Sequence, residues 1–248
     1  MSEVVCEVCV DSTASVHAAS AGGADRLELC TGLALGGLTP SSSVVAAARR
    51  VTDRPIYAMV RYRPGDFVLD RGEVEIAVAE TRELRRAGVD GIVFGAVTPG
   101  GRIDEAAVAR VVSAAGRLPV TFHRAFDHLQ DRAEGLERLV GLGVARVLTS
   151  GGAARAVDAV AELKGLVEQA GDRIVVMPGA GVTPDNAGAI VHATGARELH
   201  FSASATRPGP MRAAVGAARM GAGSGDDLVR TTADVDRVRA TVVAARGG

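Results

Sequence analysis

Short apolar runs alternate with longer Ala-rich stretches of helical patterning along the whole chain. Four of the runs share one pattern, in which Gly and then Ala or Val precede, by two residues, an apolar strand; the copies begin at Gly23, Gly88, Gly143 and Gly195. In each copy the Gly is expected to end a helix in a left-handed cap, with a strand beginning about three residues later. Further strands are expected between the copies: VVCEVCV from Val4, PIYAMV from Pro55, PVTFH from Pro119 and RIVVMP from Arg173.

Eight strands alternating with helices predict a right-handed, all-parallel α/β arrangement. The chain has 248 residues, and about 250 is typical of a (β/α)8 barrel. We therefore predict one α/β domain over residues 1–248, a single (β/α)8 TIM barrel. Residues 205–232 are rich in Gly, Pro and Arg and are expected to form a long loop after the eighth strand, before a final helix at about 234–245. That loop could be mobile or could form a lid over the site.

The faces of the strands distinguish a barrel from a doubly wound sheet, whose strands are covered and apolar on both sides. Here one face of several strands is polar. Glu7 and Cys9 share a face of the first strand, Thr121 and His123 share one in the fifth, and His200 lies opposite Leu199 in the eighth. The apolar face suits packing on the helices. The polar face is therefore expected to point into the barrel and toward its C-terminal mouth, where barrel enzymes carry their chemistry.

The inward polar residues form the candidate catalytic set: Glu7, Glu28, Arg61, His123 and His200. Such groups must pair inside a barrel to offset the cost of desolvation. A buried ion network would satisfy that need, but barrels normally fill this space with branched apolar residues, so we expect an active site. Carboxylates beside Arg61 would stay ionised, and either His could act as a general acid or base. His123, His200 and a carboxylate could also hold a divalent metal.

Turns rich in small residues follow the last three predicted strands, where barrels often bind phosphate. Tight loops also need Gly for their geometry, but we expect anion binding there, with Arg61 and Arg63 as a clamp. The candidate anion-binding residues are Arg63, Ser150, Gly151, Gly179, Gly181 and Ser202. Schiff-base chemistry needs a lysine inside the barrel. Lys164 is the only lysine, and it falls in the predicted helix after the sixth strand, so this mechanism is disfavoured.

Composition and charge exclude several classes of partner. The formal net charge is −1, which offers no basic footprint for nucleic acid. No apolar run approaches the roughly 18 residues of a membrane span, and Glu3 lies where a secretory signal would carry a basic segment. The odd count of 3 cysteines indicates reduced thiols and a cytoplasmic protein.

The cysteines form one plausible pair. Cys6 and Cys9 are three residues apart on a strand and therefore point to opposite faces. Cys9 and Cys30 both point inward on neighbouring strands, near their C-terminal ends. Two thiolates there could take a soft ion such as Cu(I). From the residues alone, buried apolar packing of the cysteines is the simpler explanation.

Several motifs together resemble the CutC copper homeostasis family. They are EVCVDSTASVHAASAGGADRLELC from Glu7, GGLTPS from Gly36, RYRPGDF from Arg61, VDGIVFG from Val89, TFHRAFD from Thr121, RVLTSGG from Arg146 and the Gly-rich turn at Gly179. The resemblance extends to about His200. It implies a cytosolic (β/α)8 barrel, often self-associating and linked to copper handling, with Cys9 and Cys30 as the positions proposed for Cu(I). It implies no particular reaction.

Two hypotheses of different kinds follow. In the first, the protein binds or handles copper through Cys9 and Cys30. In the second, it is an enzyme acting on a small anionic or phosphorylated metabolite, with His123 as the acid or base and Glu7 and Glu28 as its carboxylate partners. The first leaves the inward charged residues without a role, and the second leaves the thiols as packing.

Overall fold

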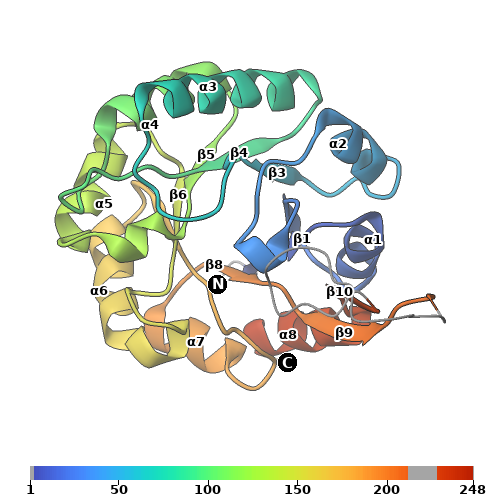
Figure 1. The fold of residues 1–248 in the computed structure, drawn as a ribbon. Coiled ribbons are helices and arrows are strands. Elements are labelled where there is room, and N and C mark those ends of the chain that lie inside the picture. Colours follow the sequence, from blue (N-terminus) through green and yellow to red (C-terminus); the bar gives the residue numbers. More distant parts are fainter. Residues whose placement is uncertain (1–2, 212–227, 248) are drawn as a thin grey trace.

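The computed structural model describes residues 3–211 and 228–247, and within them eight parallel strands surround a central axis (Figure 1). The strands are β1 (Val5–Val10), β2 (Arg26–Leu29), β3 (Ile56–Met59), β4 (Gly91–Phe94), β5 (Val120–Phe122), β6 (Arg146–Thr149), β7 (Val175–Pro178) and β8 (Glu198–Phe201). They pair in the order β7-β6-β5-β4-β3-β2-β1-β8, and β7 also lies against β8. The predicted single (β/α)8 TIM barrel is confirmed.

A ring of helices surrounds the strands (Figure 1). The helices are α1 (Thr13–Ala21), α2 (Ser42–Arg49), α3 (Arg71–Arg86), α4 (Glu105–Ala115), α5 (Arg132–Gly141), α6 (Val160–Ala170), α7 (Ala187–Thr194) and α8 (Val235–Ala245). Short 3-10 turns lie at Leu33–Leu35, Arg124–His128 and Ala156–Ala159. Side-chain caps begin several helices; Asp70, for example, accepts from the backbone N–H of Glu73 in a full capping box. No helix within the described ranges combines the length and apolar character that a membrane span requires.

The alternation of each strand divides apolar from polar side chains as predicted. Val8, Leu27 and Leu29 belong to the large core between strands and helices, whereas a smaller cluster inside the barrel contains Cys9, Cys30, Tyr57, Met59 and Val93. Buried charged residues lie on the same inward face. The barrel interior is therefore polar at its centre, and the apolar stabilisation comes from the outer layer.

The segment after β8 differs from the predicted loop over 205–232. Its two ends pair as an antiparallel hairpin of β9 (Ser204–Pro208) and β10 (Val229–Ala233), because Thr side chains at both ends favour extended backbone despite the surrounding Gly and Pro. Residues 212–227, the middle of the expected loop or lid, lie outside the described residues. The final helix, expected at 234–245, is confirmed as α8.

Candidate ligand and metal site at the barrel mouth

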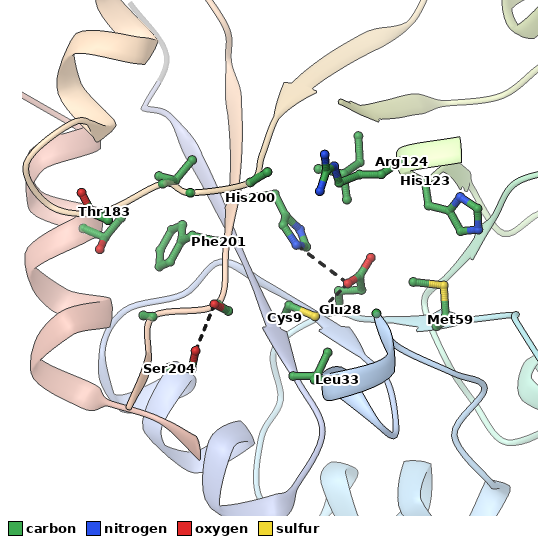
Figure 2. Close-up of a pocket in the computed structure, with 18 of the residues that line it drawn as sticks. Cys9, Glu28, Leu33, Met59, His123, Arg124, Thr183, His200, Phe201 and Ser204 are labelled. Atoms are coloured by element: carbon green, nitrogen blue, oxygen red, sulfur yellow. Dashed lines mark hydrogen bonds and ion pairs between the residues drawn. The ribbon is translucent and has the colours of Figure 1, made fainter. Parts of the chain in front are cut away.

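A cavity of about 880 Å³ opens among the loops that follow the C-terminal ends of the strands (Figure 2). Of the candidate residues, it is lined by Cys9, Glu28, Arg61, His123, Gly181, His200 and Ser202. Its wall also includes Leu33, Met59, Phe67, Arg124, His128, Leu148, Val182, Phe201 and Arg237. Most of the predicted inward residues therefore meet at one opening, which is the usual position of a ligand site on a TIM barrel.

Buried ion pairs fill the barrel below this cavity. Glu7 is fully buried and accepts from Arg26, which also pairs with Glu198. Arg146 donates to Glu198 over 3.0 Å. The guanidinium carbons of Arg26 and Arg146 lie 4.8 Å and 4.9 Å from the centre of the Tyr57 ring. The expectation that Arg61 would stand beside the carboxylates is wrong, because Arg26, the neighbour of Glu7 in the β1–β2 register, takes that place.

His200 connects the ion pairs to the cavity. Its Nδ1 lies 2.9 Å from Glu7 Oε1, and its Nε2 lies 3.8 Å from Glu28 Oε2. Burial lowers the pKa of His200, but the carboxylates of Glu28 and Glu7 outweigh it and raise that pKa above its usual value. Burial likewise opposes the charged form of Glu7, but Arg26 and His200 hold the pKa of Glu7 below its usual range. The raised pKa of His200 and the lowered pKa of Glu7 both favour a hydrogen bond from the protonated imidazole to the carboxylate.

The two inward thiols lie side by side, and Cys9 lines the cavity while Cys30 is fully buried beside it. Their Sγ atoms are 3.9 Å apart, and Cys9 Sγ donates to Glu28 Oε2 over 2.9 Å. The hydrogen bond with Cys30 and burial hold the pKa of the Cys9 thiol well above its usual range. The hydrogen bond with Cys9 lowers the pKa of Cys30, but burial and the Glu28 carboxylate raise it to about 11. Both thiols are therefore protonated near neutral pH.

Two groups of potential metal ligands occur among the described residues: Cys9, Glu28 and Cys30, and Glu7, Glu28 and His200. In each group the ligand atoms lie within 4.8 Å of one another. His123 belongs to neither, so the expected divalent site of His123, His200 and a carboxylate is not formed. The reason is the order of strands around the barrel, since β5, which precedes His123, is separated from β8 by β6 and β7.

His123 follows β5 and is only 4% exposed. Its Nδ1 accepts from the Ala125 N–H over 3.2 Å, so the ring proton is on Nε2, which has no partner within the described ranges. A Cβ on Gly95 would lie 2.4 Å from this ring, so only glycine fits there. Burial and the charge of Arg61 lower the pKa of His123 to about 3. Contrary to expectation, His123 is thus a neutral hydrogen-bond donor near pH 7 instead of a group poised to titrate.

Arg61 and Arg63 do not form the expected clamp. Arg61 donates to the carbonyl oxygens of Leu35 (2.9 Å), Gly37 (3.1 Å) and Gly65 (3.0 Å), and so ties together the loops after β2 and β3. Arg63 pairs with Glu73 over 2.6 Å and is not among the residues that line the cavity. The two arginines are two residues apart, but both lie beyond the end of β3, where strand alternation no longer aligns their guanidinium groups on one face.

The Thr149–Gly152 turn is also occupied by protein. The Ser150 N–H donates to Asp127 over 2.9 Å and the Gly151 N–H to Thr149 Oγ1 over 2.9 Å, so these groups are already engaged. Gly181 and Ser202 do line the cavity. Gly179 does not line it, and its lack of a side chain lets Leu148 and His200 pack closely against the backbone. The side chain of Lys164 is 57% exposed on α6 and pairs with Glu168, outside the barrel as expected.

The CutC family model matches residues 4–205 of the chain. The chain belongs to the CutC family. It is 47% identical over 237 residues to a family protein CutC of Xanthomonas campestris pv. campestris (strain 8004), covering 95% of this chain and 96% of the relative. It is 44% identical over 234 residues to the copper homeostasis protein cutC homolog of Homo sapiens, covering 94% and 86%. A solved CutC structure from Streptococcus agalactiae superposes with a TM-score of 0.76 at 31% identity, covering 79% of this chain and 97% of that one.

Sequence reasoning missed half of the residues that form the ion pairs inside this CutC-family barrel. Arg26, Arg146 and Glu198 were not among the predicted site residues, although each is buried. The same two-residue alternation would have found them, since Arg26 shares a face with Glu28, and Glu198 shares one with His200. All three lie at the start of their strands, where an exposed charge is the more common expectation.

Proposed function

We propose that this protein binds Cu(I) between the sulfur atoms of Cys9 and Cys30. The observation that carries the proposal is their separation of 3.9 Å at the end of neighbouring strands. A metal–thiolate bond is about 2.3 Å long for zinc, so two such bonds span sulfur atoms up to about 4.6 Å apart. One ion therefore fits between these sulfurs with little movement. The description of the human relative as a copper homeostasis protein homolog supports the same choice of metal.

The chemistry of the donors favours Cu(I) over a divalent ion. Soft thiolates select Cu(I), and the carboxyl group of Glu28 lies beside both sulfurs, 2.9 Å and 3.7 Å away. The competing group of Glu7, Glu28 and His200 is poorly suited to a cation, because Glu7 already pairs with Arg26 and His200 Nδ1 is already engaged with Glu7. The raised pKa of His200 also favours the protonated ring, which offers no lone pair to a metal. Metal binding at the thiols must release their protons.

The same thiols support the proposal of a reducing compartment. Cys6, Cys9 and Cys30 are all free and buried, and the proposed site requires the last two in reduced form. A reducing compartment such as the cytoplasm keeps them so. Self-association, which the family resemblance implies, remains a prediction that sedimentation velocity checks.

An anaerobic Cu(I) titration in competition with a strong chelator tests the metal site. Wild type should bind one ion, and Cys9→Ser or Cys30→Ser should weaken binding by more than the roughly 10–100-fold that loss of an outer contact to a metal ligand costs. Cys6→Ser is the matched control, because Cys6 is equally buried but belongs to the core on the opposite face of β1. Circular dichroism confirms that each variant is folded. Unchanged affinity in Cys9→Ser or Cys30→Ser would refute the site.

A further inference from the structure

Buried polar atoms without partners are concentrated in one place. Within the described ranges they are Glu28 Oε1, Arg61 Nε and His123 Nε2, and all three residues line the cavity at the barrel mouth. Native proteins leave few such atoms, since each loses its hydrogen bonds to water and gains none in return. Their gathering around one cavity indicates a ligand that supplies the missing hydrogen bonds.

We propose that this cavity binds a small polyhydroxylated anion, that is, a molecule carrying several hydroxyl groups and one carboxylate or phosphate. This inference does not rest on the copper site. The shared chemistry is a hydroxylated carbon chain for the inner part of the cavity and a negative charge for its rim.

The inner part of the cavity requires hydroxyl groups. His123 offers an Nε2–H donor, because its Nδ1 accepts from Ala125. Glu28 offers Oε1 as an acceptor, because its Oε2 is engaged by Cys9. Both residues line the same cavity (Figure 2), and they are only 4% and 2% exposed. Hydroxyl groups both donate and accept, so one class of group satisfies both atoms.

The rim of the cavity requires a negative charge. Arg124 uses Nε for Asp127 and Nη2 for Ser150, which leaves Nη1 without a protein partner in the described part of the chain. Arg237, on α8, donates through Nη1 to the carbonyl oxygen of Ser204. Its Nη2 likewise has no protein partner among the described residues and can donate to a ligand. An arginine presents donors in a planar fork that matches carboxylate and phosphate oxygens. A ligand whose hydroxyl groups bind His123 and Glu28 in the inner part of the cavity would place its anionic end against the arginines at the rim.

Size, apolar surface and backbone conformation agree with this occupant. A volume of about 880 Å³ lies within the range of roughly 300–1,000 Å³ for small-molecule sites. Phe67 and Phe201 supply apolar walls for the C–H faces of a carbon chain. Ala180 and Ala203, the two non-glycine residues with positive φ in the described ranges, also line the cavity. Backbone strain of this kind is retained mainly at functional sites.

Isothermal titration calorimetry on the metal-free full chain tests the proposal. The panel contains aldonates and sugar phosphates of four to six carbons, with glucose as the neutral control and adipate as the anion without hydroxyls. At least one aldonate or sugar phosphate should bind at least about tenfold more tightly than either control, and the two arms distinguish carboxylate from phosphate. Failure of every aldonate and sugar phosphate to bind, or equal binding of adipate, would overturn the proposal.

Variants locate the binding. His123→Asn keeps a side-chain acceptor for the Ala125 N–H but removes the Nε2 donor, and should weaken binding about 10–100-fold. Glu28→Gln should weaken binding by a similar factor. Arg237→Gln should also weaken binding, whereas Arg239→Gln should not, because Arg239 is an exposed neighbour on α8 that pairs with Asp236. Binding that His123→Asn and Glu28→Gln leave unchanged would overturn the assignment.

Two variants separate this proposal from the copper site. Cys30 is fully buried and is not part of the cavity wall, so Cys30→Ser should lose Cu(I) but bind the panel as wild type does. His123 belongs to neither group of potential metal ligands, so His123→Asn should lose the panel but keep Cu(I). These selective losses are expected when both proposals hold. Cu(I) binding that survives Cys30→Ser would show that the copper proposal has failed, and panel binding that survives His123→Asn would show that the ligand proposal has failed.

Discussion

Replacing His123 by Asn should change how the stability of the protein responds to acid. The His123 side chain is held in the neutral form, because burial and the charge of Arg61 lower its pKa from 6.5 to about 3. Between these two values the unfolded chain binds a proton on this imidazole that the folded chain does not. The stability associated with His123 is therefore fully present above pH 6.5 and is lost as the pH falls toward 3.

The size of the effect follows from the two pKa values. One pKa unit corresponds to about 1.4 kcal/mol, so the His123 contribution falls by about 2 kcal/mol between about pH 7 and about pH 5, and by about 5 kcal/mol over the whole window. Asn at this position cannot titrate, yet its side-chain oxygen can still accept from the Ala125 N–H that His123 Nδ1 now binds. The variant should therefore lose less stability in acid than wild type.

Urea unfolding followed by circular dichroism at about pH 7, 6 and 5 measures the effect as the free-energy difference between wild type and variant. That difference should shift in favour of the variant by about 2 kcal/mol over this range. His17→Asn is the matched control, since His17 is exposed on α1 and should give no such shift. A pH-independent difference for His123→Asn would show that the folded imidazole is not held neutral.

Two further predictions concern packing and buried charge. Gly95→Ala places a Cβ 2.4 Å from the His123 ring and should lower the free energy of unfolding by about 1–3 kcal/mol. Gly165→Ala, in open space on α6, should raise the free energy of unfolding by about 0.5–1 kcal/mol. A lower free energy of unfolding in both variants would contradict the packing explanation. Arg26→Met removes the shared partner of two buried carboxylates, Glu7 and Glu198, and should cost about 3–5 kcal/mol in urea unfolding. Arg173→Met breaks an exposed pair and should cost less than about 1 kcal/mol. Equal costs would contradict the larger contribution assigned to the buried pairs.

The sequence predicted which residues belong to the candidate site better than it predicted which of them contact one another. Alternation along each strand predicted that Glu7, Glu28 and His200 would face inward, and the structure brings their side-chain atoms within 4.8 Å of one another. It also predicted that Cys9 and Cys30 would be neighbours, and their sulfurs are 3.9 Å apart. The prediction that Arg61 would lie beside the inward carboxylates failed, because that residue lies beyond the end of β3, where side chains no longer alternate between two faces.

The sequence by itself determined the eight parallel strands, the closing helix and the face on which each inward residue lies. These features depend on the period of the backbone and on local caps, which neighbouring residues specify. Only the tertiary structure decided that Arg26 pairs with Glu7, that His123 stays apart from His200, and that the pKa of His123 is lowered while that of His200 is raised. These outcomes depend on strand order, register and burial, and a pKa is the sum of charges and desolvation contributed by residues far apart in the chain.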